Sequence, residues 1–312
     1  MTHALLIPAD FATSVVAVPP LALTPDLAVA PEPNLALVRH IVGGGVSILL
    51  YGGNANLYNF SLPAYGEALA LMEEAGELAR VVTSIGPDFG KMLDQAPLVE
   101  RSRLRNVMLL PMAFPADSHG ASEGVRRIVD RLGFGVILYL KREHYIRPEV
   151  LEKLVAEGAV RFVKYAVERD DPAEDGYLDA VLSAVGQELV ASGMGETPIA
   201  DHVGRRKVAT YTSGAVCIAP AAAMRLLATL RRGDGEAADA AAAPFLAFER
   251  LRAQLGGIQT LHSAVTASGI ADMGPLMPMV SMVKERNMPL VRAAVAELMQ
   301  AERKASAQVA PS

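Results

Sequence analysis

A lysine inside a short apolar segment is the residue with the clearest potential for chemistry. Residues 160–166 read Val-Arg-Phe-Val-Lys-Tyr-Ala, and these β-branched and aromatic side chains, bounded by Gly158 and an acidic loop, predict a β-strand. Side chains alternate between the faces of a strand, so Lys164 shares a face with Phe162 and Ala166. Burial favours the neutral amine, which can attack a carbonyl carbon to form a Schiff base. The alternative is a lysine at the strand end that reaches solvent.

A tyrosine near the end of the preceding predicted strand, residues 135–140, offers a partner for this lysine. Consecutive parallel strands usually lie side by side, so Tyr139 and Lys164 are expected near the same edge. A phenol hydroxyl beside an amine can move the protons that Schiff-base formation requires. Taken alone, Tyr139 could equally be a core aromatic residue.

The elements that must position these two residues alternate as strand and helix along most of the chain. The predicted strands are apolar throughout, as parallel strands buried on both faces are. Eight strand–helix units are typical of a (β/α)8 TIM barrel. An open doubly wound sheet is the alternative, but Pro19-Pro20 replaces the Gly-rich phosphate turn expected after its first strand. The predicted strands cover residues 13–19, 46–51, 80–85, 106–110, 135–140, 160–166, 188–192 and 207–213.

The domain organisation predicted from this pattern is a barrel followed by extra helices. Residues 1–232 are expected to form the barrel, and residues 233–312 an α-helical extension packed on it, because this region is rich in Ala, Leu and Met at helical spacing. Residues 1–11 are expected to be a frayed start and the tail from Ala305 to be disordered. The methionines between 273 and 282 are expected to fill a core or a subunit contact.

Composition excludes several classes of function. A net charge of −5 gives no broad basic surface for nucleic acid. The single cysteine, Cys217, excludes an internal disulfide framework and a cysteine-cluster metal site, and the histidines show no metal-ligand spacing. No apolar run is long enough to span a membrane. We therefore expect a soluble cytoplasmic protein with no metal site.

Four segments resemble the dihydrodipicolinate synthase / N-acetylneuraminate lyase family of class I aldolases, over roughly residues 33–282. They are Gly-Gly-Asn-Ala-Asn-Leu-Tyr-Asn-Phe-Ser-Leu at 52–62, Ile-Leu-Tyr139, Phe-Val-Lys164-Tyr-Ala and Ser192-Gly193-Met-Gly-Glu196. The resemblance implies that Lys164 forms a covalent imine with a 2-keto acid, without a cofactor, and that Tyr139 relays protons. It also implies a homotetramer or a homodimer.

The predicted binding residues lie at strand ends, where barrel active sites are built. The resemblance implies that the turn holding Gly53, Asn54 and Ala55 binds the substrate carboxylate, as a Gly-rich turn can through its backbone N–H groups. Arg142 could bind a carboxylate through its fork of donors, or be a solvated loop residue. The set is completed by Gly193 and Ser213, at the ends of the seventh and eighth predicted strands.

Other polar residues near the predicted strand ends have less defined roles. His144, in the loop that holds Arg142, could face the substrate. Asn56 and Tyr58 are expected to pack the second loop rather than take part in chemistry.

Two segments depart from the family pattern. The usual turn Gly-Thr-Thr-Gly-Glu reads Gly-Gly-Asn-Ala-Asn at 52–56 and has no hydroxyl, and the paired tyrosines that often follow the fourth-strand proline are replaced by Met-Ala-Phe at 112–114. Condensation of pyruvate with aspartate semialdehyde is therefore not expected.

The function predicted from these residues is a Schiff-base-forming lyase, either an aldolase or a dehydratase. Its substrate would be a 2-keto acid such as pyruvate or a 2-keto-3-deoxy sugar acid. Two alternatives stay open. One is a catalytically inactive barrel that binds a keto or sugar acid as a sensor. The other is a metal-dependent barrel aldolase, which would need clustered His and carboxylate ligands at the strand ends.

Overall fold

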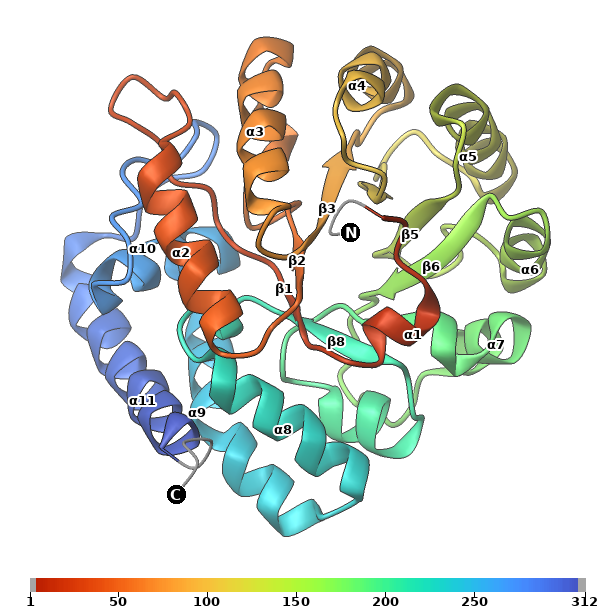
Figure 1. Ribbon diagram of the computed structural model, residues 1–312. Helices are drawn as coiled ribbons and strands as arrows, with labels where there is room; N and C mark the ends of the chain where they lie inside the picture. Colours follow the sequence, from red (N-terminus) through yellow and green to blue (C-terminus); the bar gives the residue numbers. More distant parts are fainter. Residues whose placement is uncertain (1–3, 308–312) are drawn as a thin grey trace.

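Eight parallel strands form a closed barrel in the computed structural model, which describes residues 4–307 (Figure 1). Each strand pairs with the next in chain order, and β1 pairs with β8. The predicted (β/α)8 barrel is therefore confirmed, and the open sheet is excluded. The strands are β1 (Val16–Ala17), β2 (Ile48–Leu50), β3 (Arg80–Ile85), β4 (Val107–Leu109), β5 (Val136–Leu140), β6 (Val160–Tyr165), β7 (Val190–Ser192) and β8 (Thr210–Ser213).

Helices surround the barrel and cover the outer faces of the strands. They are α2 (Pro31–Gly43), α3 (Leu62–Ala75), α4 (Phe89–Arg101), α5 (Ser118–Leu132), α6 (Pro148–Ala156), α7 (Gly176–Val185) and α8 (Pro220–Arg232). Side chains define several starts: Asp175, for example, accepts a hydrogen bond from the Leu178 amide and begins α7. Between β7 and β8 the chain forms a short π-helix at Ala200–Arg205.

Side-chain alternation places the predicted lysine inside the barrel. Phe162 and Ala166 belong to the interior apolar cluster, whereas Val163 and Tyr165 pack outward against the helices. Lys164 pairs with Tyr139 across β5 and β6, so the two residues lie side by side on the inner face. The predicted shared face and the predicted pairing are both confirmed.

The N-terminal segment closes one end of the barrel, so the expectation of a frayed start is wrong for residues 4–11, and residues 1–3 lie outside the described part of the chain. The short helix α1 (Pro8–Phe11) lies across that end (Figure 1). The Phe11 ring stacks on Phe162 with 3.6 Å between centroids, and the Leu6 amide donates to Asn106 Oδ1 at 2.8 Å. Leu6 and Phe11 are both buried and therefore fill the barrel from the end opposite the strand tips.

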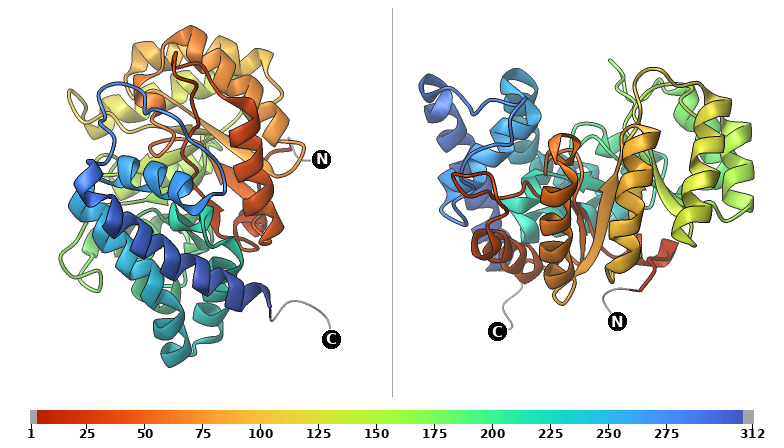
Figure 2. Two further views of the ribbon diagram at one scale, coloured as in Figure 1. Left: turned by 90° about the vertical axis from the view of Figure 1, so that its left-hand side faces the viewer. Right: turned by 90° about the horizontal axis from the view of Figure 1, so that it is seen from above.

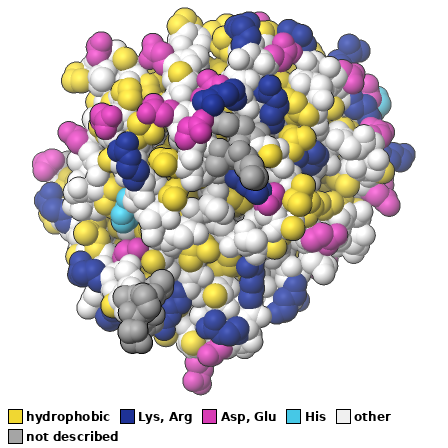
Figure 3. Space-filling model, in the orientation of Figure 1, with side chains coloured by type: hydrophobic (Ala, Val, Ile, Leu, Met, Phe, Trp, Pro, Cys, Tyr) yellow, Lys and Arg dark blue, Asp and Glu magenta, His cyan; other side chains and the backbone are white. Residues whose placement is uncertain are grey.

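Charged side chains of both signs are distributed over the surface at this end of the barrel. Basic and acidic side chains are interspersed on this face, without a continuous basic region (Figure 3). No α-helix within residues 4–307 combines the length and the apolar character needed to cross a bilayer.

Three helices follow the barrel and pack together on one side of it (Figure 2). They are α9 (Gly235–Leu255), α10 (Gly257–Ser268) and α11 (Met288–Ser306). The disorder expected from Ala305 is wrong for the last turn of α11, where Ala305 is buried, and residues 308–312 lie outside the described part of the chain. Division of the chain between residues 232 and 233 stays a prediction.

Candidate active site

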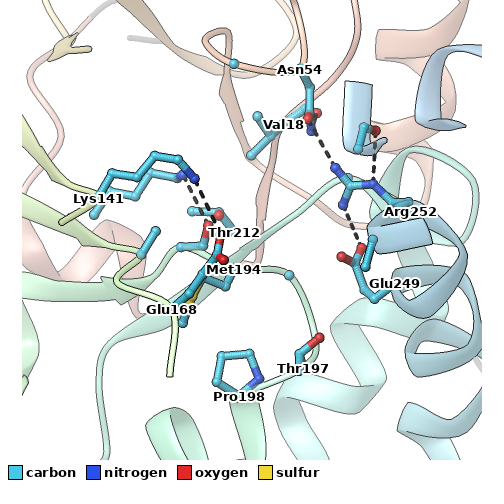
Figure 4. Close-up of a pocket in the computed structure, with 18 of the residues that line it drawn as sticks. Val18, Asn54, Lys141, Glu168, Met194, Thr197, Pro198, Thr212, Glu249 and Arg252 are labelled. Carbon is cyan, nitrogen blue, oxygen red and sulfur yellow. Dashed lines mark hydrogen bonds and ion pairs between the residues drawn. The ribbon is translucent and has the colours of Figure 1, made fainter. Parts of the chain in front are cut away.

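The strand tips open into a cavity of about 800 Å³ at the carboxyl end of the barrel. Its walls come from the ends of the strands, from the loops that follow them and from α9 (Figure 4). Lys164 and Tyr139 lie at its inner end, among residues that also line the barrel interior. This is the end of a (β/α)8 barrel at which active sites are found.

Lys164 is buried at the bottom of this cavity, with 6% of its surface exposed. Its Nζ donates a hydrogen bond to the Gly193 carbonyl at 3.2 Å. A Cβ on Gly193 would lie 3.0 Å from the lysine Cγ, so a glycine is needed for this close approach. Burial, with smaller contributions from the positive charges of Lys141 and Arg252, lowers the pKa of Lys164 from 10.5 to about 7. A large fraction of the amine is therefore uncharged near neutral pH.

Tyr139 lies directly against the lysine. The Lys164 Nζ sits 3.8 Å from the centre of the phenol ring, over its face, so the tyrosine hydroxyl is not the group that holds the amine. Burial raises the pKa of Tyr139, which keeps the hydroxyl protonated and able to donate. A second phenol, Tyr58, also lines the cavity, and burial raises its pKa as well. Tyr58 therefore lines the cavity, and the expectation that it packs its loop rather than takes part in chemistry stays a prediction.

The turn after β2 contributes part of its predicted set to the cavity. Gly53 and Asn54 line it, whereas Ala55 is buried and lies outside the lining. The Asn54 side chain is already occupied: its Nδ2 donates to the Val18 carbonyl at 2.8 Å, and its Oδ1 accepts from Arg252 at 3.2 Å. Asn54 therefore shapes the wall and holds Arg252, which leaves its amide less free for a substrate carboxylate than expected.

Two other predicted binding residues lie outside the cavity lining. Arg142 Nη2 donates to the Ala116 carbonyl at 2.8 Å, and its guanidinium lies over the Tyr145 ring. Ser213 is buried, and its Oγ accepts a hydrogen bond from the Val216 amide at 3.1 Å. The alternation of side chains along a strand explains why Arg142 lies outside the lining. Tyr139 faces inward, so the residues after it that continue the inward face of β5 have odd numbers.

The cationic residue that does line the cavity at the end of β5 is Lys141. It lies two residues beyond Tyr139 and forms an ion pair with Glu168 at 3.7 Å (Figure 4). His144 is largely exposed, pairs with Glu143 and lies outside the cavity lining. Neither Arg142 nor His144, the two predicted residues that follow β5, therefore reaches the cavity. The alternation of side chains along the strand predicts Lys141 instead.

The outer face of β6 is fixed by buried hydrogen bonds. The Tyr165 hydroxyl lies 2.7 and 2.8 Å from the two carboxyl oxygens of Asp175, which also pairs with Arg169. On the adjacent strand, Ser192 Oγ lies 2.9 Å from Nδ1 of His202. The contact between Tyr165 and Asp175 therefore anchors the outer face of β6, the strand that carries Lys164, and the Ser192 contact anchors the neighbouring strand β7.

A buried carboxyl group lies behind the loop after β7. Glu196 is 1% exposed, and within residues 4–307 no hydrogen bond of ordinary geometry reaches its carboxyl oxygens, although the Ser213 hydroxyl is close enough to favour their charged form slightly. Burial, followed by the negative charge of Glu249, raises the pKa of Glu196 well above its usual 4.5. The neutral carboxylic acid is therefore the favoured form of this side chain in the folded protein.

Replacing Glu196 by glutamine is expected to flatten the dependence of stability on pH. Between pH 4.5 and the raised pKa, the folded state keeps a proton that the unfolded state has released. Folding stability must therefore fall as pH rises through this range, by at most about 1.4 kcal/mol per pH unit. Glu196→Gln removes this loss, and urea unfolding at several pH values measures it. Glu152→Gln, on the exposed face of α6, is the control. Equal slopes for wild type and Glu196→Gln would contradict the buried neutral acid.

The described residues offer no evident place for a metal ion. Within residues 4–307, no group of three or more His, Cys, Asp or Glu side chains is arranged to hold one. The cavity lining offers the Lys164 amine, two phenols, the hydroxyls of Thr197 and Thr212, and several charged side chains.

Sequence comparisons gave no match, either to a protein-family model or to a curated protein. Solved structures do match the fold. Dihydrodipicolinate synthase from Bacillus clausii has a TM-score of 0.79 and 21% identity, covering 95% of this chain and all of its own. Sialic acid aldolase from Ruminococcus gnavus has a TM-score of 0.80 and 13% identity, covering 94% and 99%.

A third structure was solved with a small keto acid bound. It is a prophage protein of the dihydrodipicolinic acid synthase family from E. coli K12 in complex with pyruvate, with a TM-score of 0.79 and 14% identity over 91% of this chain and 98% of its own. Identities this low establish a shared fold. The chain therefore has the barrel, with its added C-terminal helices, that structures of the dihydrodipicolinate synthase family have.

Proposed function

We propose that this protein is a lyase of the dihydrodipicolinate synthase / N-acetylneuraminate lyase type that acts on a 2-keto acid through an imine on Lys164. The observation that carries the proposal is the buried amine, which faces a large cavity and has a pKa lowered to about 7. The names of the matching structures support the same chemistry, because they include an aldolase and a pyruvate complex.

The proposed reaction begins with attack of the neutral Lys164 Nζ on the keto carbon. A proton moves to the resulting carbinolamine oxygen, water leaves and a protonated imine forms. In carbon–carbon cleavage the hydroxyl on C4 loses its proton, the C3–C4 bond breaks and its electron pair passes to the imine, which gives an enamine and an aldehyde. In dehydration C3 loses a proton to give the enamine, which then expels the C4 hydroxyl together with its bonding electron pair, and protonation of that hydroxyl gives water. Protonation of the enamine and hydrolysis of the imine release the product and restore the amine. We assign the proton transfers at the carbinolamine to Tyr139, which lies against the amine.

Positive charge near the amine suits an acid substrate. Lys141 and Arg252 both contribute a positive potential at Lys164. A carboxylate beside the reacting carbonyl is attracted to this region, and Gly53, which lines the cavity, is the part of the turn after β2 that we assign to the carboxylate. The homodimer or homotetramer and the cytoplasmic location stay predictions.

Trapping with cyanoborohydride tests the proposal. Incubation with pyruvate should give one covalent adduct on Lys164, identified by peptide mass mapping. Because the pKa of Lys164 is about 7, the trapping rate should rise about tenfold per pH unit below pH 7 and level off above pH 8. A rate that still rises at pH 10 would indicate an ordinary lysine.

The sensor alternative predicts a different result from the same experiment. A protein that binds keto acids without chemistry would show binding by calorimetry but no adduct on Lys164 under any of these conditions. Adducts spread equally over several surface lysines would remove the basis for assigning a role to Lys164.

A further inference from the structure

The C-terminal extension supplies one wall of the cavity, and an ion pair on α9 forms part of this wall. Glu249 and Arg252 lie one turn apart on this helix, and their side chains are 11% and 13% exposed. Arg252 Nη1 donates to Glu249 Oε1 at 2.6 Å, Nη2 donates to Asn54 Oδ1, and Nε donates to the Gly257 carbonyl, both at 3.2 Å. Figure 4 shows Arg252 reaching between Asn54 and Glu249.

Two glycines at the strand tips make room for this ion pair. A Cβ on Gly195 would lie 2.7 Å from the Glu249 carboxyl carbon, and Gly195 has a φ of +65°, which favours glycine. A Cβ on Gly214 would lie 3.2 Å from Arg252 Nη1. The pair is therefore fixed against the ends of β7 and β8 as well as on its own helix, and it is part of the rigid wall.

The hydrogen bonds of the pair leave groups available to a ligand. Among residues 4–307, Glu249 Oε2 has no hydrogen-bond partner, and Arg252 uses three of its five N–H donors. Both residues line the cavity. The wall therefore offers a carboxylate acceptor beside guanidinium donors.

The charges of the pair select among possible ligands. A second carboxylate placed near Arg252 would also lie beside Glu249, and an ammonium group near Glu249 would also lie beside Arg252, so the attraction of either ion to one residue is offset by repulsion from the other. An apolar chain would take the pair out of water without offering it a new hydrogen bond, which is costly for charged groups. A hydroxyl group satisfies both residues, because it can donate to the carboxylate and accept from the guanidinium.

The size of the cavity indicates where such hydroxyls would lie. A volume of about 800 Å³ exceeds what a three-carbon acid needs and falls within the range of sites for much larger ligands. Lys164 and Arg252 line the same cavity, so a ligand chain bound at the amine can extend toward α9.

We propose that Glu249 and Arg252 bind hydroxyl groups on the carbons beyond the keto group, so that the preferred substrate is a polyhydroxylated 2-keto acid. This inference rests on the proposed imine at Lys164 for the position of the keto end. It assigns the selection of substrate to the C-terminal extension, and the chemistry to the barrel.

The test compares four acids as probes for trapping on Lys164: 2-keto-3-deoxygluconate, 2-ketohexanoate, 2-ketoglutarate and pyruvate. The first two have chains of equal length, with and without distal hydroxyls, and 2-ketoglutarate adds a second carboxylate. The concentration of 2-keto-3-deoxygluconate that gives half-maximal adduct should be at least about tenfold lower than that of 2-ketohexanoate or 2-ketoglutarate.

Variants of the pair should remove this preference. Arg252→Met alone leaves a buried carboxylate unpaired, so the double variant Glu249→Gln/Arg252→Met, which removes both charges, protects against misfolding. The double variant should bring the half-maximal concentrations of the two six-carbon monoacids within about threefold of each other. Glu236→Gln and Arg250→Met, on exposed positions of α9, are the matched controls and should keep the preference.

The possible outcomes separate this proposal from the proposed function. Adduct formation by wild type without preference for the hydroxylated acid, or a preference that survives in the double variant, would overturn the role of the pair. A variant that weakens trapping by all four acids equally would show that the pair only maintains the structure. Absence of an adduct with every acid, pyruvate included, would instead overturn the imine chemistry itself.

Discussion

Replacing Lys164 by methionine is expected to abolish adduct formation with pyruvate and to lower any lyase turnover by at least about 10³-fold. The amine is the nucleophile of the proposed reaction, and no other described lysine that lines the cavity is buried to this extent: Lys141 is half exposed and paired with Glu168. Mass spectrometry after cyanoborohydride treatment measures the adduct, and an assay for pyruvate release measures turnover.

Folding should survive this change, which makes its effect on chemistry readable. Methionine has a length and shape similar to those of lysine. Burial already destabilises the charged form of Lys164, as its lowered pKa shows, so an apolar side chain suits the same position. The thermal unfolding midpoint of Lys164→Met should therefore stay close to that of wild type or rise. Lys153→Met, at an exposed position on α6, is the matched control and should trap pyruvate normally. If Lys164→Met still forms the pyruvate adduct, on another lysine, the assignment of Lys164 as the imine-forming residue is contradicted.

Regular alternation of side chains made the inner part of the site predictable from the sequence. The uniformly apolar strands indicated a closed parallel barrel, and the period of two placed Lys164 inside it and beside Tyr139. The same rule also identifies Lys141, which continues the inward face of β5. The prediction of Arg142 rests on its charge and not on its position in the strand, and the structure directs its side chain to the Ala116 carbonyl instead.

Contacts between distant parts of the chain could not be predicted in this way. Arg252 meets Asn54 across 198 residues of sequence, and nothing in the composition of α9 distinguishes Arg252 from the exposed Arg250. Only the packing of the extension against the barrel decides which arginine faces the cavity. Leu6 and Phe11 were missed for a related reason, because two apolar residues around a four-residue helix give no periodic pattern.

Replacing Tyr139 by phenylalanine is expected to slow imine formation by about 10²–10⁴-fold, the usual contribution of a positioned proton-transfer group. The contact of the Lys164 amine is with the ring face, and phenylalanine keeps this face. Burial, the main cause of the lowered lysine pKa, also stays. The half-maximal concentration of pyruvate and the pH at which trapping levels off should therefore change little, while the maximal rate falls.

A second tyrosine makes this experiment decisive about which hydroxyl transfers the proton. Tyr58 also lines the cavity, so Tyr58→Phe should be compared directly with Tyr139→Phe. Tyr65→Phe is the control for losing a buried hydroxyl elsewhere, because Tyr65 contacts Thr83 behind the strands, outside the cavity lining. If Tyr139→Phe keeps the wild-type trapping rate and Tyr58→Phe loses it, the relay belongs to the loop after β2. Tyr139 would then serve only as the surface on which the amine rests, and the missing hydroxyls of residues 52–56 would be replaced from within their own loop.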